Sequence, residues 1–167
     1  SAQIHTWRNH IALDIFEVKA PLDRLFENEI WVRVNKDLRA TLKGESDLSA
    51  ALDQKVRAYQ SAQRKIPRRP DKIIIDNESS NFFTIIEIYT HDFPGLLYKI
   101  THALFRCKLD IRVAKIGTKA DQVVDVFYVR DFDGQKANSQ DQVAAIKEAI
   151  KETLTSGPTS HHTIPIC

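Results

Sequence analysis

The sequence lacks several features that define large classes of proteins. It contains no methionine, and its two cysteines, Cys107 and Cys167, form no C-x-x-C pair. A structural zinc site or a disulfide-stapled secreted scaffold needs more cysteines at closer spacing, so both are disfavoured and a cytoplasmic location fits best. Because even an initiator methionine is missing, we expect the chain to be one piece of a longer protein.

Long hydrophobic runs and charge of one sign are also missing. No segment has enough consecutive apolar residues to cross a bilayer. The 24 basic and 22 acidic residues give a net charge of only +2, so no field of one sign would attract nucleic acid or anionic lipid. With 43% hydrophobic residues, the chain can still fill a packed core. We therefore expect a soluble globular protein without nucleic acid or membrane as a partner.

The N-terminal part has the pattern of a β-hairpin followed by two helices. Short β-prone runs at 4–7 and 12–18 flank a polar break suited to a turn. Residues 28–42 carry apolar side chains at the spacing of one helical face, and Gly44 can end that helix. A second short helix is expected over 48–63.

The C-terminal part alternates between strand and helix patterns in the manner of a two-layer α+β fold. We expect strands at 72–77, 82–90, 111–118 and 123–130, and helices at 94–108 and 140–154. A further short strand near 163–166 would complete a ferredoxin-like βαββαβ unit.

The sequence also repeats itself. Residues 2–6 (AQIHT) resemble 114–118 (AKIGT), and 14–18 (DIFEV) resemble 125–129 (DVFYV), at a separation of about 111 residues with one gap. In each copy a helix follows the two blocks. The N-terminal part is therefore predicted to be the back half of a first copy, which should be incomplete by itself.

These observations predict three segments. Residues 1–64 form the partial first repeat, and residues 72–167 form the complete second unit. Between them, segment 65–71 contains Pro67 and Pro70, which end helices and keep a chain extended, so it is predicted to be a linker.

The stretch between the strand at 82–90 and the following helix is the best candidate for a binding site. A helix N-terminus offers unpaired backbone N–H groups and the positive end of the helix dipole, and both favour a carboxylate. Gly95 would let a ligand approach without a Cβ in the way. Asp92 could accept the ammonium group of a free amino acid, or it could simply cap the helix while Pro94 and Gly95 form a tight turn.

The same stretch resembles a known family. The sequence Asp92-Phe93-Pro94-Gly95-Leu96-Leu97 is similar to the D-R-P-G-L-L motif of ACT domains, with Phe93 in place of the common arginine. Together with blocks 75–80, 114–118 and 125–129, it resembles the tandem ACT pair that ends bacterial PII uridylyltransferases, the bifunctional uridylyltransferase/uridylyl-removing enzymes of nitrogen metabolism.

This resemblance implies an allosteric region that senses a free amino acid, with glutamine as the expected ligand and the PII protein as a partner of the full-length parent. In that family, uridylyl transfer belongs to a nucleotidyltransferase domain and hydrolysis to an HD metal domain, and neither pattern occurs in this chain. We therefore expect no catalytic residue, metal ligand or cofactor in this chain.

By resemblance, the ligand lies between the strand-to-helix turn of one ACT unit and the strand after the helix of its neighbour. ACT units would pair within the chain or in a homodimer. The expected ligand-binding residues are His91, Asp92, Phe93, Pro94, Gly95 and Leu96, with Asp110, Ile111 and Arg112 as the opposing wall.

Two alternatives stay open at this point. The ligand could be another amino acid, because an anion-binding turn suits any α-amino acid. The module could also be a scaffold in which exposed sheet edges mediate dimerisation and the turn binds nothing. An independent enzyme is disfavoured, because no nucleophile, metal set or cofactor loop accompanies His91 and Asp92.

Overall fold

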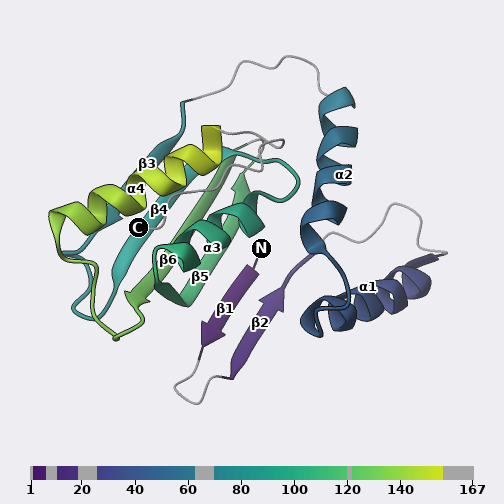
Figure 1. The fold of residues 1–167 in the computed structure, drawn as a ribbon, viewed down its shortest axis with the longest axis horizontal. Helices are drawn as coiled ribbons and strands as arrows, with labels where there is room; N and C mark the ends of the chain where they lie inside the picture. Colours follow the sequence, from purple (N-terminus) through teal and green to yellow (C-terminus); the bar gives the residue numbers. More distant parts are fainter. Residues whose placement is uncertain (1, 7–10, 19–25, 63–69, 120–121, 156–167) are drawn as a thin grey trace.

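The computed structural model describes residues 2–6, 11–18, 26–62, 70–119 and 122–155, and Figure 1 shows how their elements are arranged. The N-terminal part forms β1 (Ala2–Thr6), β2 (Ala12–Phe16), α1 (Glu27–Leu42) and α2 (Leu48–Ala62). The remainder forms β3 (Lys72–Asp76), β4 (Thr84–His91), α3 (Leu96–Arg106), β5 (Leu109–Lys119), β6 (Gln122–Asp131) and α4 (Gln140–Thr155).

The described strands build one six-stranded sheet in the order β2-β1-β5-β6-β4-β3. Every pairing in it is antiparallel. The predicted α+β fold class is therefore confirmed. β3 pairs with the side of β4 that faces away from β6, while the short strand expected near 163–166 lies outside the described residues.

Helices α3 and α4 cover one face of the sheet, as Figure 1 shows. Side chains alternate between the two faces of a strand, so every second residue of β4 and β6 points toward these helices. Ile88 and Phe127 belong to this buried row, and Ile100 of α3 and Ile146 of α4 pack against it, all at 0% exposure. The core thus lies between the helix pair and the centre of the sheet.

The internal repeat has a counterpart in the strand register. In the N-terminal hairpin, Ile4 lies opposite Asp14. In the β5–β6 hairpin, the equivalent residues Ile116 and Asp125 lie opposite each other. The two hairpins therefore share both sequence and register.

The two copies also pair directly with each other, through β1 and β5. Gln3 lies opposite Lys115, and these two residues occupy the same position in the two copies of the repeat. An antiparallel pair centred on equivalent residues has a local two-fold relation. One continuous sheet therefore contains both copies of the repeated hairpin.

Helix α1 leaves its apolar face open among the described residues. It has no buried residue, and Leu38 and Leu42 are 55% and 78% exposed. An exposed apolar face of this kind is typical of a surface that another part of a protein covers. The segment boundaries remain predictions, and most of the expected linker lies outside the described residues.

Within the part of the chain that the structure describes, no helix combines the length and the apolar character needed to cross a membrane.

The position of Phe127 at the centre of the core gives a first test. Phe127→Ala should lower the free energy of unfolding by about 3–5 kcal/mol, because it leaves a cavity between α3, α4 and the sheet. Phe132→Ala is the matched control, since Phe132 is 57% exposed and its loss should cost less than about 1 kcal/mol. Urea denaturation of both variants would measure the difference, and equal losses would contradict this description of the core.

Candidate functional site

The turn between β4 and α3 is shaped by Gly95. Its φ is 85°, in the left-handed region that favours glycine, and it is the N-cap residue of α3. No side chain caps this helix, and the Leu96 amide donates to the Phe93 carbonyl oxygen at 3.1 Å. The expectation that Asp92 caps the helix is therefore wrong, because the helix begins at Leu96 instead of Pro94, whereas Pro94 and Gly95 form the expected turn.

The first turn of α3 presents unpaired backbone donors. The Lys99 amide donates to the Gly95 carbonyl oxygen at 3.0 Å, which is the first regular bond of the helix. The amides of Leu97 and Tyr98 have no backbone acceptor among the described residues, as expected for a helix N-terminus. Together with the helix dipole, they favour an anionic group beside this turn.

A cavity of about 310 Å³ lies next to these amides. Its wall combines the turn, the first residues of α3 and the facing parts of β5 and β6. The lining residues are Asp92, Phe93, Pro94, Gly95, Leu96, Leu97, Tyr98, Ile116, Val123 and Asp125. Five of the predicted ligand-binding residues, Asp92 to Leu96, are thus brought together around one cavity.

His91, the sixth residue predicted at this turn, is the last residue of β4 and lies opposite Gln122 of β6. It adjoins the cavity in sequence but does not line it.

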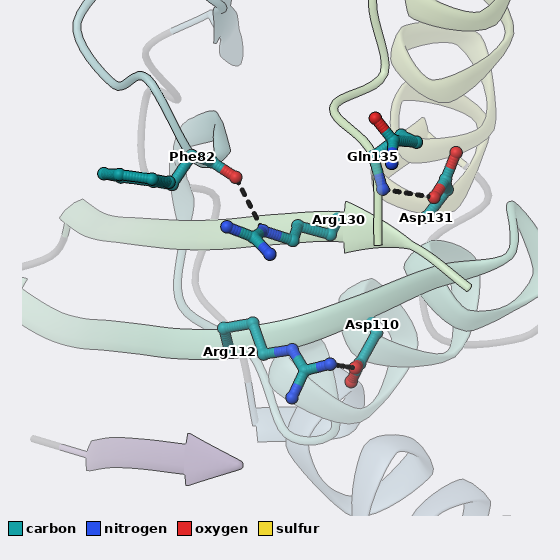
Figure 2. A network of polar contacts seen from close by, with 6 residues as sticks. All are labelled: Phe82, Asp110, Arg112, Arg130, Asp131 and Gln135. Carbon is teal, nitrogen blue, oxygen red and sulfur yellow. Dashed lines mark hydrogen bonds and ion pairs between the residues drawn. The ribbon is translucent and has the colours of Figure 1, made fainter. Parts of the chain in front are cut away.

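Asp110, Ile111 and Arg112 lie at the opposite end of the sheet from this turn. Asp110 is opposite Arg130, near the start of β4, whereas the turn follows the end of β4. Figure 2 shows Asp110 and Arg112 facing each other, with Arg112 Nη2 2.8 Å from Asp110 Oδ2. These residues do not line the cavity, and their predicted role toward a neighbouring unit's turn stays a prediction.

Ile116, Val123 and Asp125 were missed as site residues from the sequence. A signal for Asp125 was present, because Val123, Asp125, Phe127 and Val129 alternate in a strand and so share one face. A carboxyl group in an otherwise apolar, helix-facing row is the kind of exception that marks a functional position.

Asp125 is 1% exposed, and its Oδ1 has no hydrogen-bond partner among the described residues. The pKa of Asp125 is raised to about 7, mainly by burial; a hydrogen bond from the Gly117 amide opposes this increase, and the nearby Asp92 carboxylate adds to it. Near neutral pH, this carboxyl group is therefore poised between its neutral and its charged form.

Helix α2 packs against the outer side of the turn. The Tyr59 hydroxyl donates to the backbone carbonyl oxygen of Asp92 at 3.1 Å. A Cβ added to Gly95 would lie 3.6 Å from Leu52 Cδ2, and Val56 is 2% exposed. Across the same contact, burial lowers the pKa of Lys99 and the charge of Asp53 opposes this decrease. The N-terminal part therefore contacts the candidate site directly.

The described residues contain no group of three or more His, Cys, Asp or Glu side chains that could hold a metal ion. Asp92 and Asp125 supply only two carboxyl groups to the cavity. The histidine pair His161-His162 lies outside the described residues. The absence of catalytic, metal and cofactor residues remains a prediction.

Residues 72–158 match the family model described as ACR9-like, ACT-like domain. Because this match covers more than half of the chain, the chain belongs to the ACT-like domain family.

The relatives of the chain share one name. The chain is 35% identical over 159 residues to a bifunctional uridylyltransferase/uridylyl-removing enzyme of Azospirillum brasilense, covering 92% of this chain and 16% of that protein. The protein of the same name from Gluconobacter oxydans is 34% identical over 160 residues, covering 95% and 17%. The one from Rhodospirillum rubrum is 35% identical over 155 residues, covering 92% and 16%.

The predicted resemblance to these enzymes is confirmed. The chain spans only 16 to 17% of the length of these three relatives. No solved structure matches the chain.

The positive φ of Gly95 predicts a defined stability loss. Gly95→Ala should lower the free energy of unfolding by roughly 1–2 kcal/mol, because an L-residue is strained in this conformation, while the new Cβ makes only an ordinary contact with Leu52. Gly134→Ala is the matched control, since Gly134 has φ 82° and nothing within 4 Å of an added Cβ. Similar losses in urea denaturation are expected, and a much larger loss for Gly95→Ala would contradict backbone strain as the cause.

The raised pKa of Asp125 predicts a specific pH dependence of stability. Between about pH 4 and pH 7, the folded protein holds a proton that the unfolded chain has released, so the free energy of unfolding decreases as the pH rises. At about 1.4 kcal/mol for each pKa unit, a pKa near 7 instead of 3.8 corresponds to up to about 4 kcal/mol.

Urea denaturation across this pH range, compared between the wild type and Asp125→Asn, would isolate that contribution. Asp14→Asn is the control, because Asp14 holds the same position in the first hairpin but is exposed. Identical pH profiles for the wild type and Asp125→Asn would show that Asp125 titrates normally.

Proposed function

We propose that this chain is an amino-acid-sensing regulatory region of a bifunctional uridylyltransferase/uridylyl-removing enzyme, with glutamine as its ligand. The observation that carries the proposal is the cavity at the N-terminus of α3, in a chain whose relatives bear that name. The residues of the turn and the names of the relatives both support this proposal. The net charge adds nothing to it, because it favours no macromolecular partner.

The chemistry of the cavity suits a zwitterion. The free amides of Leu97 and Tyr98 can donate to a carboxylate, and the carboxyl groups of Asp92 and Asp125 can accept from an ammonium group. The remaining lining is apolar and can contact a side chain. A cavity of about 310 Å³ lies at the lower end of the range for small-molecule sites.

Regulation would act through the two contacts that join the candidate site to the N-terminal part. These are the β1–β5 pairing and the contact of α2 with the turn. A ligand changes an equilibrium only through different affinities for two arrangements. Glutamine would favour one arrangement and so shift the balance between uridylylation and uridylyl removal on PII, both performed elsewhere in a cytoplasmic parent protein.

A scaffold role is the second candidate, and the exposed apolar residues of the sheet edge favour it. On β2, Leu13, Ile15 and Phe16 are 44 to 56% exposed, and a free edge strand is a natural pairing surface. If substitutions on β2 separate a dimer while no amino acid binds, this candidate replaces the sensor.

The proposal predicts stabilisation by an amino acid. At a hundredfold excess over Kd, a ligand adds about 2.7 kcal/mol to the free energy of unfolding. For a chain of this size, that corresponds to a melting temperature increase of roughly 5–10 °C. Each common amino acid would be tested separately by thermal unfolding of the full chain. A shift with glutamine supports the proposal, and a shift with another amino acid alone changes the ligand.

A matched pair of variants assigns any shift to the cavity. Ile116→Phe enlarges a side chain that lines it and should reduce or abolish the shift. Ile73→Phe makes the same change on β3, at a residue that also packs against the core but does not line the cavity, and should retain the shift. Loss in both variants, or in neither, would place binding elsewhere.

A further inference from the structure

Asp125 is a buried carboxyl group at a strand position where the fold would accept an apolar side chain. The row of β6 that faces the helices is otherwise apolar, and Asp125 stands in it between Val123 and Phe127 with 1% exposure. An unpaired buried carboxyl oxygen destabilises a protein unless something compensates for it. In the described residues, Oδ1 has no such partner.

The first copy of the repeat shows that the hairpin does not need this burial. Asp14 lies opposite Ile4 just as Asp125 lies opposite Ile116, yet Asp14 is exposed. What separates the two residues is the turn and the first residues of α3, which close a cavity beside Asp125. The burial of the unpartnered carboxyl oxygen therefore goes together with the cavity, and the hairpin itself does not cause it.

The charges around the cavity restrict what could pair with Asp125. Its described lining contains two carboxyl groups, Asp92 and Asp125, and no lysine, arginine or histidine. A cation is therefore favoured beside these carboxyl groups. Leu97 and Tyr98 also line the cavity, and their backbone amides, which have no acceptor among the described residues, favour an anion. One small molecule with both charges satisfies the whole cavity.

We infer that Asp125 accepts a hydrogen bond, through Oδ1, from the protonated primary amine of the ligand and thereby selects zwitterionic amino acids. The ligand's carboxylate then lies against the Leu97 and Tyr98 amides. This inference rests on the proposed function for the identity of the ligand as an amino acid. It assigns the residue that distinguishes an amino acid from a plain carboxylic acid.

The assignment couples binding to protonation. Two neighbouring groups act on Asp125 directly: the Gly117 amide from β5, which donates a hydrogen bond to it, and the Asp92 carboxylate from the turn. Tyr98 of α3 is the other titratable residue that lines the cavity. An ammonium group binds the ionised form of Asp125, so ligand binding must displace the proton that burial retains. The affinity for an amino acid should therefore increase from pH 5.5 to pH 7.5.

The test measures binding to the full chain by isothermal titration calorimetry with three probes. They are glutamine, its analogue without the amino group (4-carbamoylbutanoate) and the simple amine n-propylammonium. Asp125→Asn should weaken glutamine binding by about tenfold or more, the loss typical of a charge-assisted hydrogen bond, and should remove its pH dependence. The analogue should bind both proteins alike, and Asp14→Asn should behave as the wild type.

A second measurement needs no variant and covers the case in which Asp125→Asn fails to fold. In the wild type, the carboxyl carbon resonance of Asp125 can be followed by NMR as a function of pH. Saturating glutamine should lower the pKa of Asp125 by at least one unit, whereas 4-carbamoylbutanoate should not lower it.

The outcomes separate this inference from the proposed function. If glutamine binds the wild type and Asp125→Asn equally, with the same pH profile, the inference is overturned and the proposed function stands. If only n-propylammonium binds and lowers the pKa of Asp125, amine recognition stands and the amino-acid sensor is overturned. If no probe binds, both are overturned.

Discussion

The left-handed backbone at Gly95 is the constraint on which the candidate site depends. Because the chain reverses there, α3 begins directly after the turn, and its first residues line a cavity together with residues of β5 and β6. The same reversal places Ile100 and Leu104 of α3 over the core, where both are fully buried. It also brings the turn against α2. One residue conformation thus links the packing of the second copy, the polar groups of the cavity and the contact with the first copy.

Asp125 gives the cavity its chemical character. A protein core normally excludes an unpaired carboxyl group, since its desolvation opposes folding. The fold tolerates Asp125 by keeping it largely protonated below pH 7, with a hydrogen bond from the Gly117 amide. A ligand ammonium group would replace that proton with a charge-assisted bond. The same buried carboxyl group would then lower the free energy of unfolding and select for an amine.

Much of the fold could be predicted from the sequence, because it follows from local periodicity. The alternation in β4 and β6 and the helical spacing in α3 and α4 reflect which side chains face the core. The repeat between 2–6 and 114–118 also predicted related hairpins. Pairing of the units within the chain or in a homodimer was expected from the resemblance, but the strands and the register that form it, centred on Gln3 and Lys115, could not be predicted. Strand partners are set by the whole sheet and not by either strand.

The site was predictable only where it is contiguous in sequence. Asp92 to Leu96 form one turn and were found together. Ile116, Val123 and Asp125 come from two other strands, and only the sheet register brings them to that turn. Asp110 and Arg112 lie near the start of β5, at the other end of the sheet from the turn, because α3 returns the chain to that end before β5 begins.

Backbone amide NMR of the full chain with added glutamine tests most directly whether a free amino acid binds at the N-terminus of α3. If it does, the largest chemical shift changes should fall on the amides of Leu97, Tyr98 and Gly117. Saturating glutamine that leaves these three resonances unchanged, or that moves only those of residues 110–112, would contradict it.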